Sequence, residues 1–167
     1  MGFSVGIDLG TSSVKVLLVG DGGNIVRVAS REYPVHRPEV DWVEQDPADW
    51  WEATSASINE VTSDVDPREV GAVGLTGQMH GSVFLDADHE VLRPAILWND
   101  QRTSAQCEEI LDTIGERRLI ELTSNPPFEG FTAPKIMWVM ENEPEVFERT
   151  EKILLPKDYI RYRLTGE

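Results

Sequence analysis

The sequence contains a single cysteine, Cys107, so an internal disulfide is excluded. Proteins without disulfides are typical of reducing compartments, and we therefore expect a cytoplasmic location. Cys107 falls on the apolar stripe of a predicted helix, which favours a buried, unreactive thiol over a nucleophile. The sequence also lacks the cysteine and histidine spacing of a structural zinc site.

Long apolar runs and positive charge are scarce as well. No stretch approaches the roughly twenty apolar residues that cross a bilayer, and the first residues do not resemble a signal peptide, so we expect no membrane partner. The chain carries 15 Lys and Arg against 30 Asp and Glu, a formal net charge of −15. Such an acidic chain is not expected to bind nucleic acid. A nucleotide remains compatible, because backbone N–H groups and Mg²⁺ can neutralise phosphates locally.

The sequence does contain a short polar turn between two predicted strands near its start. Apolar residues alternate over 3–7 and again over 14–18, as in half-buried strands. The turn at 10–13 combines a glycine with hydroxyl side chains, so its backbone N–H groups are accessible to a phosphate. Asp8 ends the first strand, where it can hold hydrated Mg²⁺ beside that phosphate. The alternative is an ordinary hairpin whose turn uses these residues for conformational reasons.

The segments that follow predict an α/β fold. A third strand begins at Ile25 after a glycine-rich turn, so three antiparallel strands occupy the first part of the chain. A strand over 70–76 ends at Gly77. Between them Asp46 is typical of a helix N-cap, and the helix that it opens carries one apolar face: Trp50, Thr54, Ile58 and Val61. The pattern predicts a mixed sheet flanked by helices.

Shorter elements are predicted in the second half of the chain. Residues 82–85, 95–98 and 153–155 have the composition of short strands. Thr103 and Gln106 have the spacing of a capping box, which would start a helix that ends at Gly115. We expect the apolar stripe of this helix to point inward: Cys107, Ile110, Leu111 and Ile114.

Two polar clusters follow predicted strands, where ligand sites of α/β proteins gather. In Gly77–Gly81 two glycines flank Gln78, Met79 and His80, and the amide and imidazole offer donors and acceptors suited to hydroxyl groups. The alternative is a glycine-rich connection with a structural histidine. In the second cluster Asn99 and Asp100 follow a tryptophan. These residues could bind a polyol, or they could simply cap a helix.

Several motifs resemble the FGGY family of carbohydrate kinases, which belongs to the actin/hexokinase-like ATPase (ribonuclease H-like) superfamily. Residues 8–15 resemble the phosphate-binding opening of that family, and residues 130–142 fit its first signature pattern. Within the family, residues 77–81 and 96–100 are similar to those of the xylulokinase branch. The similarity runs from the first strand to the last residue.

The resemblance implies phosphoryl transfer from ATP to a terminal hydroxyl of D-xylulose, with Mg²⁺ as cofactor. It assigns Asp8 a catalytic and metal-binding role, and it assigns the ATP phosphates to Gly10, Thr11, Ser12 and Lys15. Met79 and His80 would contact the sugar, with Gln78, Asn99 and Asp100 as further candidates. A homodimer is compatible with this assignment.

The resemblance also predicts the domain organisation. Residues 1–167 correspond to the N-terminal part of the family's domain I, with the phosphate turn and the sugar-side wall. The catalytic aspartate of the family follows the Thr-Gly-Glu at 165–167, and its domain II supplies the adenine pocket. We therefore expect the 167 residues alone to be inactive. The alternatives are another sugar or polyol kinase of the same family, or a sugar-binding fragment without chemistry.

Overall fold

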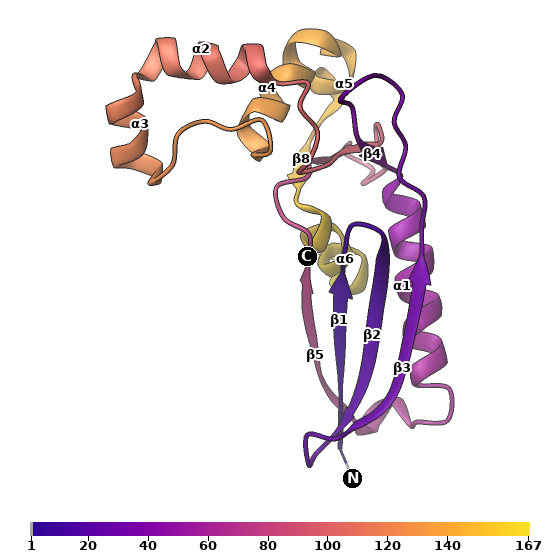
Figure 1. Ribbon diagram of the computed structural model, residues 1–167. Coiled ribbons are helices and arrows are strands. Elements are labelled where there is room, and N and C mark those ends of the chain that lie inside the picture. The colour runs from indigo at the N-terminus through magenta and orange to yellow at the C-terminus, as the bar shows by residue number, and fades with distance from the viewer. Residues whose placement is uncertain (1) are drawn as a thin grey trace. The chain divides into compact units, whose positions relative to one another are not determined.

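A computed structural model describes residues 2–167 and divides them into two compact units (Figure 1). The first unit comprises the segment that ends at Val35, together with Asp46–Met79 and Pro156–Glu167. The second unit comprises His36–Gln45 and His80–Leu155. The boundary between the units therefore falls inside the predicted sugar motif, between Met79 and His80.

The first unit is built on a four-stranded sheet. Its strands are β1 (Phe3–Leu9), β2 (Ser13–Gly20), β3 (Ile25–Glu32) and β5 (Val70–Gly77), in the order β3-β2-β1-β5. The first three are antiparallel and β5 runs parallel to β1, so the predicted mixed sheet is confirmed. Alternation along β1 and β2 buries one face of the sheet, through Val5, Ile7, Leu9, Val14, Val16 and Leu18.

Helices pack against this sheet in the same unit. Helix α1 (Pro47–Val61) contacts β1, β2 and β3, and α6 (Pro156–Thr165) contacts α1 and β5. A 3-10 turn, η1 (Pro67–Glu69), precedes β5. The predicted N-cap is confirmed, since the Asp46 carboxylate accepts the Ala48 N–H at 2.8 Å. Of the predicted apolar face, Trp50, Thr54 and Val61 are buried and Ile58 is half-buried.

The second unit combines two short antiparallel pairs with four helices. Strand β4 (Glu44–Gln45) pairs with β7 (Ala95–Ile96), and β6 (Val83–Leu85) pairs with β8 (Lys152–Leu154). The helices are α2 (Ser104–Ile114), α3 (Glu116–Thr123), α4 (Thr132–Asn142) and α5 (Pro144–Arg149). Its apolar core contains Phe84, Ile96, Trp138 and Val139.

Three local predictions for the second unit are wrong. Thr103 precedes α2, but its hydroxyl donates to the Glu129 carbonyl at 3.3 Å and caps nothing, while Gln106 bonds Glu141. These longer-range partners replace the capping box. Ile114, expected to point inward, is 41% exposed. The strand predicted over 95–98 ends at Ile96, because the chain turns at 97–100, where the Asp100 N–H donates to the Leu97 carbonyl at 3.2 Å.

No helix within residues 2–167 combines the length and the apolar character needed to cross a membrane.

Candidate active site

The polar turn predicted to bind phosphate connects β1 to β2. The last pair of the β1–β2 ladder joins Leu9 to Val14. Beyond it the turn closes on itself, because the Gly10 N–H donates to the Ser13 carbonyl at 3.0 Å. A side chain at position 10 would bring its Cβ within 3.0 Å of that same oxygen, so glycine suits the turn sterically.

Asp8 lies on the open face of the sheet. It is exposed, and its ladder partners are Lys15 on β2 and Thr76 on β5. These residues line a groove of about 360 Å³ on the strands of the first unit, where Gly6 and Gly74 leave space beside the carboxylate. The groove thus presents one carboxylate and one ammonium group beside two glycines.

The donor set fits a magnesium ion held mainly by its nucleotide. Within residues 2–167, no three acidic, histidine or cysteine side chains come together as a metal cage. Mg²⁺ typically keeps several waters and uses one or two carboxylates together with substrate phosphates. The exposed Asp8 carboxylate meets that requirement, whereas a resident ion with an all-protein ligand set would not fit here.

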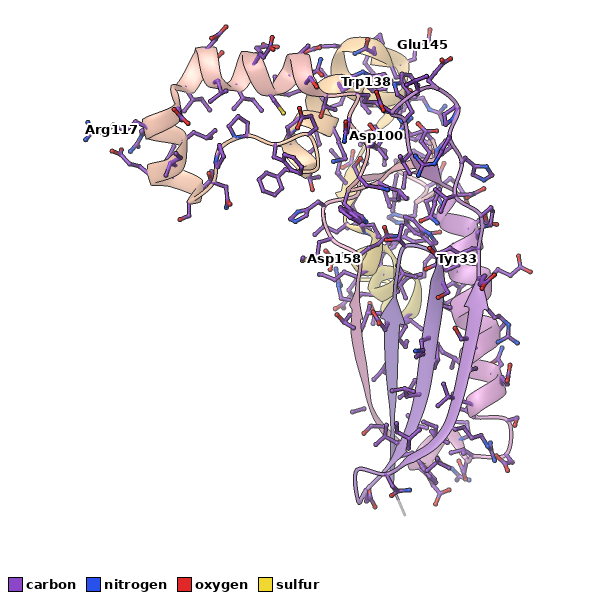
Figure 2. All side chains as sticks on the ribbon, in the orientation of Figure 1. Tyr33, Asp100, Arg117, Trp138, Glu145 and Asp158 are labelled. Carbon is purple, nitrogen blue, oxygen red and sulfur yellow. The ribbon has the colours of Figure 1, made fainter. Side chains whose placement is uncertain are left out.

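Tyr33 is bonded to the turn, and the sequence analysis did not identify it. It follows β3, and Figure 2 shows it at the end of the sheet where the turn lies. Its hydroxyl donates to the Gly10 carbonyl at 2.5 Å, and its N–H donates to the Ser12 carbonyl at 3.2 Å. The β2–β3 register pairs Ser13 with Glu32, so counting back from the hairpin would have set Tyr33 beside Ser12.

The end of β5 lies against the same turn. The Gln78 N–H donates to the Leu9 carbonyl at 2.7 Å, and the Gln78 side-chain amide lies 3.5 Å from the Gly10 carbonyl. A Cβ at Gly77 would lie 2.7 Å from Leu9, so only glycine permits this approach of the two strands. Met79 follows with 56% of its surface exposed. The first unit therefore brings Gln78 to the phosphate turn.

His80 is held from the start of α4 in the second unit. Its backbone has a left-handed φ of 65°, and its carbonyl accepts the Thr132 hydroxyl at 3.1 Å. The imidazole packs edge-on against the Phe131 ring, with centroids 5.0 Å apart. His80 also lines an apolar cavity of about 640 Å³ among α2, α3 and α4.

Asp100 lies in a buried ionic network rather than at an open surface. Its carboxylate accepts the Val43 N–H at 2.6 Å and the N–H, Nε and Nη2 groups of Arg102 at 2.7 to 3.0 Å. The Arg102 guanidinium lies over the rings of Trp42 and Trp138, at 3.8 and 4.8 Å from their centroids. The four donors occupy the carboxylate oxygens and hold the strand end rigidly.

Asn99, next to Asp100, is the more accessible member of that cluster. It is half-buried, and its Oδ1 atom has no hydrogen-bond partner among residues 2–167. A buried amide oxygen without a donor is costly unless a ligand or water supplies one. Of the two residues, Asn99 therefore retains capacity for a further hydrogen bond.

Lys135 anchors the chain that leads into α4. Its side chain is fully buried, and Nζ donates to the carbonyls of Glu129, Gly130 and Phe131 at 2.6 to 3.0 Å. Burial lowers the pKa of Lys135 to about 8, against the opposing charge of Asp100. The residue thus fixes the backbone that presents Phe131 to His80.

The predicted site residues divide between the units. The first unit holds Asp8, Gly10, Thr11, Ser12, Lys15, Gln78 and Met79, and the structure brings Gln78 to the turn and Asp8 to the groove beside Lys15. The second unit holds His80, Asn99 and Asp100.

Comparison with known proteins gives a consistent family. The sequence model of the FGGY family of carbohydrate kinases, N-terminal domain, matches residues 3–167. The chain is 47% identical to a xylulose kinase of Escherichia coli over 163 residues, covering 98% of this chain and 33% of that protein. It is 45% identical to a xylulose kinase of Bacillus subtilis over 168 residues, covering 99% and 34%.

A solved structure agrees with these relatives. The "xyloylose kinase" of Brucella ovis superposes with a TM-score of 0.90 at 45% identity, covering 99% of this chain and 34% of that one. The chain thus spans about a third of the length of the curated relatives and of the solved structure that it matches.

Proposed function

The chain belongs to the FGGY family of carbohydrate kinases, and from this premise we propose that the protein containing it transfers the γ-phosphoryl group of ATP to D-xylulose, giving D-xylulose 5-phosphate. The observation that carries the proposal is the 47% identity to a xylulose kinase across nearly the whole chain. The exposed Asp8 groove beside a closed glycine–hydroxyl turn supports it physically.

The first unit would bind the phosphates. Catalysis of phosphoryl transfer depends mostly on positioning and charge neutralisation, for which backbone N–H groups and one cation suffice. In this proposal Gly10, Thr11 and Ser12 contact the β- and γ-phosphates and Lys15 adds a positive charge. When bound, Mg²⁺ would neutralise the phosphate oxygens, and Asp8 would hold it there.

The sugar would be recognised by Met79 and His80, with Gln78 and Asn99 as further donors or acceptors. Asn99 offers an unpartnered amide oxygen, and His80 has a half-buried imidazole packed on Phe131. Asp100 contributes indirectly in this proposal, because its carboxylate is already saturated by Val43 and Arg102 and can only keep Asn99 in position.

The domain organisation is part of the proposal. Residues 1–167 form the N-terminal part of domain I, and the remaining length of the relatives would supply the catalytic base and the adenine pocket. We also propose a cytoplasmic location, where the Cys107 thiol stays reduced. A homodimer, and the lack of nucleic-acid and membrane partners, stay predictions.

The test is an assay of the full-length protein with a panel of acceptors. ADP release is measured with D-xylulose, D-ribulose, gluconate and glycerol at equal concentrations. We expect kcat/KM to be highest for D-xylulose by at least about tenfold, since a site built for one hydroxyl pattern leaves polar groups unpaired with another. Higher turnover with another acceptor would assign the protein to a different branch of the family.

A further inference from the structure

Tyr33 holds the phosphate turn from two directions. Its hydroxyl donates to the Gly10 carbonyl and its backbone N–H donates to the Ser12 carbonyl, at 2.5 and 3.2 Å. Only 8% of Tyr33 is exposed, so water does not compete effectively for either bond. Tyr33, the residue after β3, thus fixes both the first and the third residue of the turn.

These bonds determine which backbone groups the turn can offer. The Ser13 carbonyl is already occupied by the Gly10 N–H, and Tyr33 occupies the carbonyls of Gly10 and Ser12. A carbonyl oxygen repels a phosphate, whereas an N–H group attracts it. With these three carbonyls engaged by donors of the protein, the turn is fixed in a form in which these three oxygens are turned to the protein rather than to an anion.

We propose that Tyr33 is a positioning residue for phosphoryl transfer, which pre-organises the Gly10–Ser13 turn for the ATP phosphates through its hydroxyl bond to Gly10. The inference rests on the proposed kinase function and assigns to it a residue outside the resemblance motifs. Tyr33 itself touches no substrate in this account. Its effect reaches the phosphates through the backbone, because fixed donors cost no reorganisation when charge develops.

The hydroxyl keeps its donor role throughout the working range of a kinase. Burial, and then the negative charge of Asp8, raises the pKa of the Tyr33 phenol above its usual value near 10. The phenol therefore remains protonated wherever the enzyme is assayed, so the bond to Gly10 is insensitive to pH there.

The test uses Tyr33→Phe in the full-length protein, which deletes only the hydroxyl and keeps the buried ring. Thr62→Val is the matched control, since the Thr62 hydroxyl also donates to a backbone carbonyl of the first unit, that of Ile58 at 2.8 Å, at the end of α1 and outside the turn. For both variants and the wild type, kcat and the KM values for ATP and D-xylulose are measured, with the melting temperature and ATP affinity by calorimetry.

We expect Tyr33→Phe to lower kcat/KM for ATP by about three- to tenfold, the effect of one hydrogen bond, while the KM for D-xylulose stays within about twofold. Thr62→Val should leave both constants unchanged. Wild-type kcat/KM for ATP in Tyr33→Phe overturns the inference, and so does an equal loss for both substrates that follows the melting temperature. If the wild type does not phosphorylate D-xylulose, the proposed substrate is wrong. The ATP affinity then decides the role of Tyr33 by itself, because Tyr33→Phe should bind ATP more weakly than the wild type.

Discussion

Replacing Lys135 by methionine removes a buried ammonium group from the start of α4. The loss affects the Gly130 carbonyl most, which accepts a hydrogen bond from Lys135 Nζ at 2.6 Å. Gly130 stands one residue before Phe131, the N-cap of α4, so its carbonyl lies outside the bonds of the helix. Lys135 therefore supplies a donor that the helix does not, and methionine of similar length leaves the carbonyl buried without that donor.

The expected cost at neutral pH follows from that single carbonyl. The Glu129 carbonyl keeps the Thr103 hydroxyl, at 3.3 Å, and so loses less. One stranded buried acceptor costs about 1–3 kcal/mol, which is partly offset because methionine avoids burying a charge. We expect the Lys135→Met protein to unfold about 3–10 °C below the wild type at pH 7.

The difference between the two proteins should grow with pH. The pKa of Lys135 is about 8 in the folded chain and 10.5 in a model peptide. Between these values the unfolded chain binds more protons at this residue than the folded chain, so the free energy of unfolding of the wild type rises with pH. The gain is about 3 kcal/mol at most, and Lys135→Met lacks it.

Urea unfolding followed by circular dichroism at pH 7, 8, 9 and 10 measures this divergence. Lys157→Met controls for the loss of one positive charge from an acidic chain, at a partly exposed position on α6. Parallel stability curves for the wild type and Lys135→Met over this range would refute the reasoning. A lysine carbon NMR titration that gives Lys135 a midpoint near 10.5 would refute it independently.

Three further variants test the site in the full-length protein. Asp8→Asn keeps the shape but removes the charge that would hold Mg²⁺, so kcat should fall by about a hundredfold or more while D-xylulose binding survives; retained turnover with unchanged Mg²⁺ dependence would mean that Asp8 serves only the turn. His80→Ala should weaken D-xylulose binding by roughly five- to 150-fold with little change in melting temperature, and the reverse result would make His80 structural. Gly77→Ala places a Cβ 2.7 Å from Leu9, so it should lower the free energy of unfolding by about 1–3 kcal/mol and raise the KM for ATP. A melting temperature equal to that of the wild type would contradict this close approach.

The sheet and its first turn were predictable because their signals are local. Alternation over β1 and β2 marks the buried face residue by residue, and Asp46 caps α1 through an N–H only two positions away. Such patterns depend on bonds between near neighbours in the chain, where the sequence already contains both partners.

The failures have the opposite origin, since partners distant in the chain decide them. Thr103 carries a good capping sequence, yet the Glu129 carbonyl, 26 residues away, takes its hydroxyl. Asp100 stays a predicted sugar contact, but the sequence could not show that the Val43 N–H, 57 positions away, and Arg102 occupy its carboxylate. Tyr33 after a strand has the pattern of an ordinary core aromatic, and only the β2–β3 register brings its hydroxyl to Gly10.

The covalent link between Met79 and His80 joins two separately organised sets of groups. On one side Gln78 is bonded to Leu9, so the end of β5 follows any change in the phosphate turn. On the other side His80 is held by Thr132 and Phe131 at the start of α4, whose backbone Lys135 anchors. Variants of Tyr33 should therefore alter the kinetics with ATP, and variants of His80 the affinity for the sugar. Variants at 77–79 should alter both, because this short run of backbone leads from the residue bonded to the turn directly to the histidine.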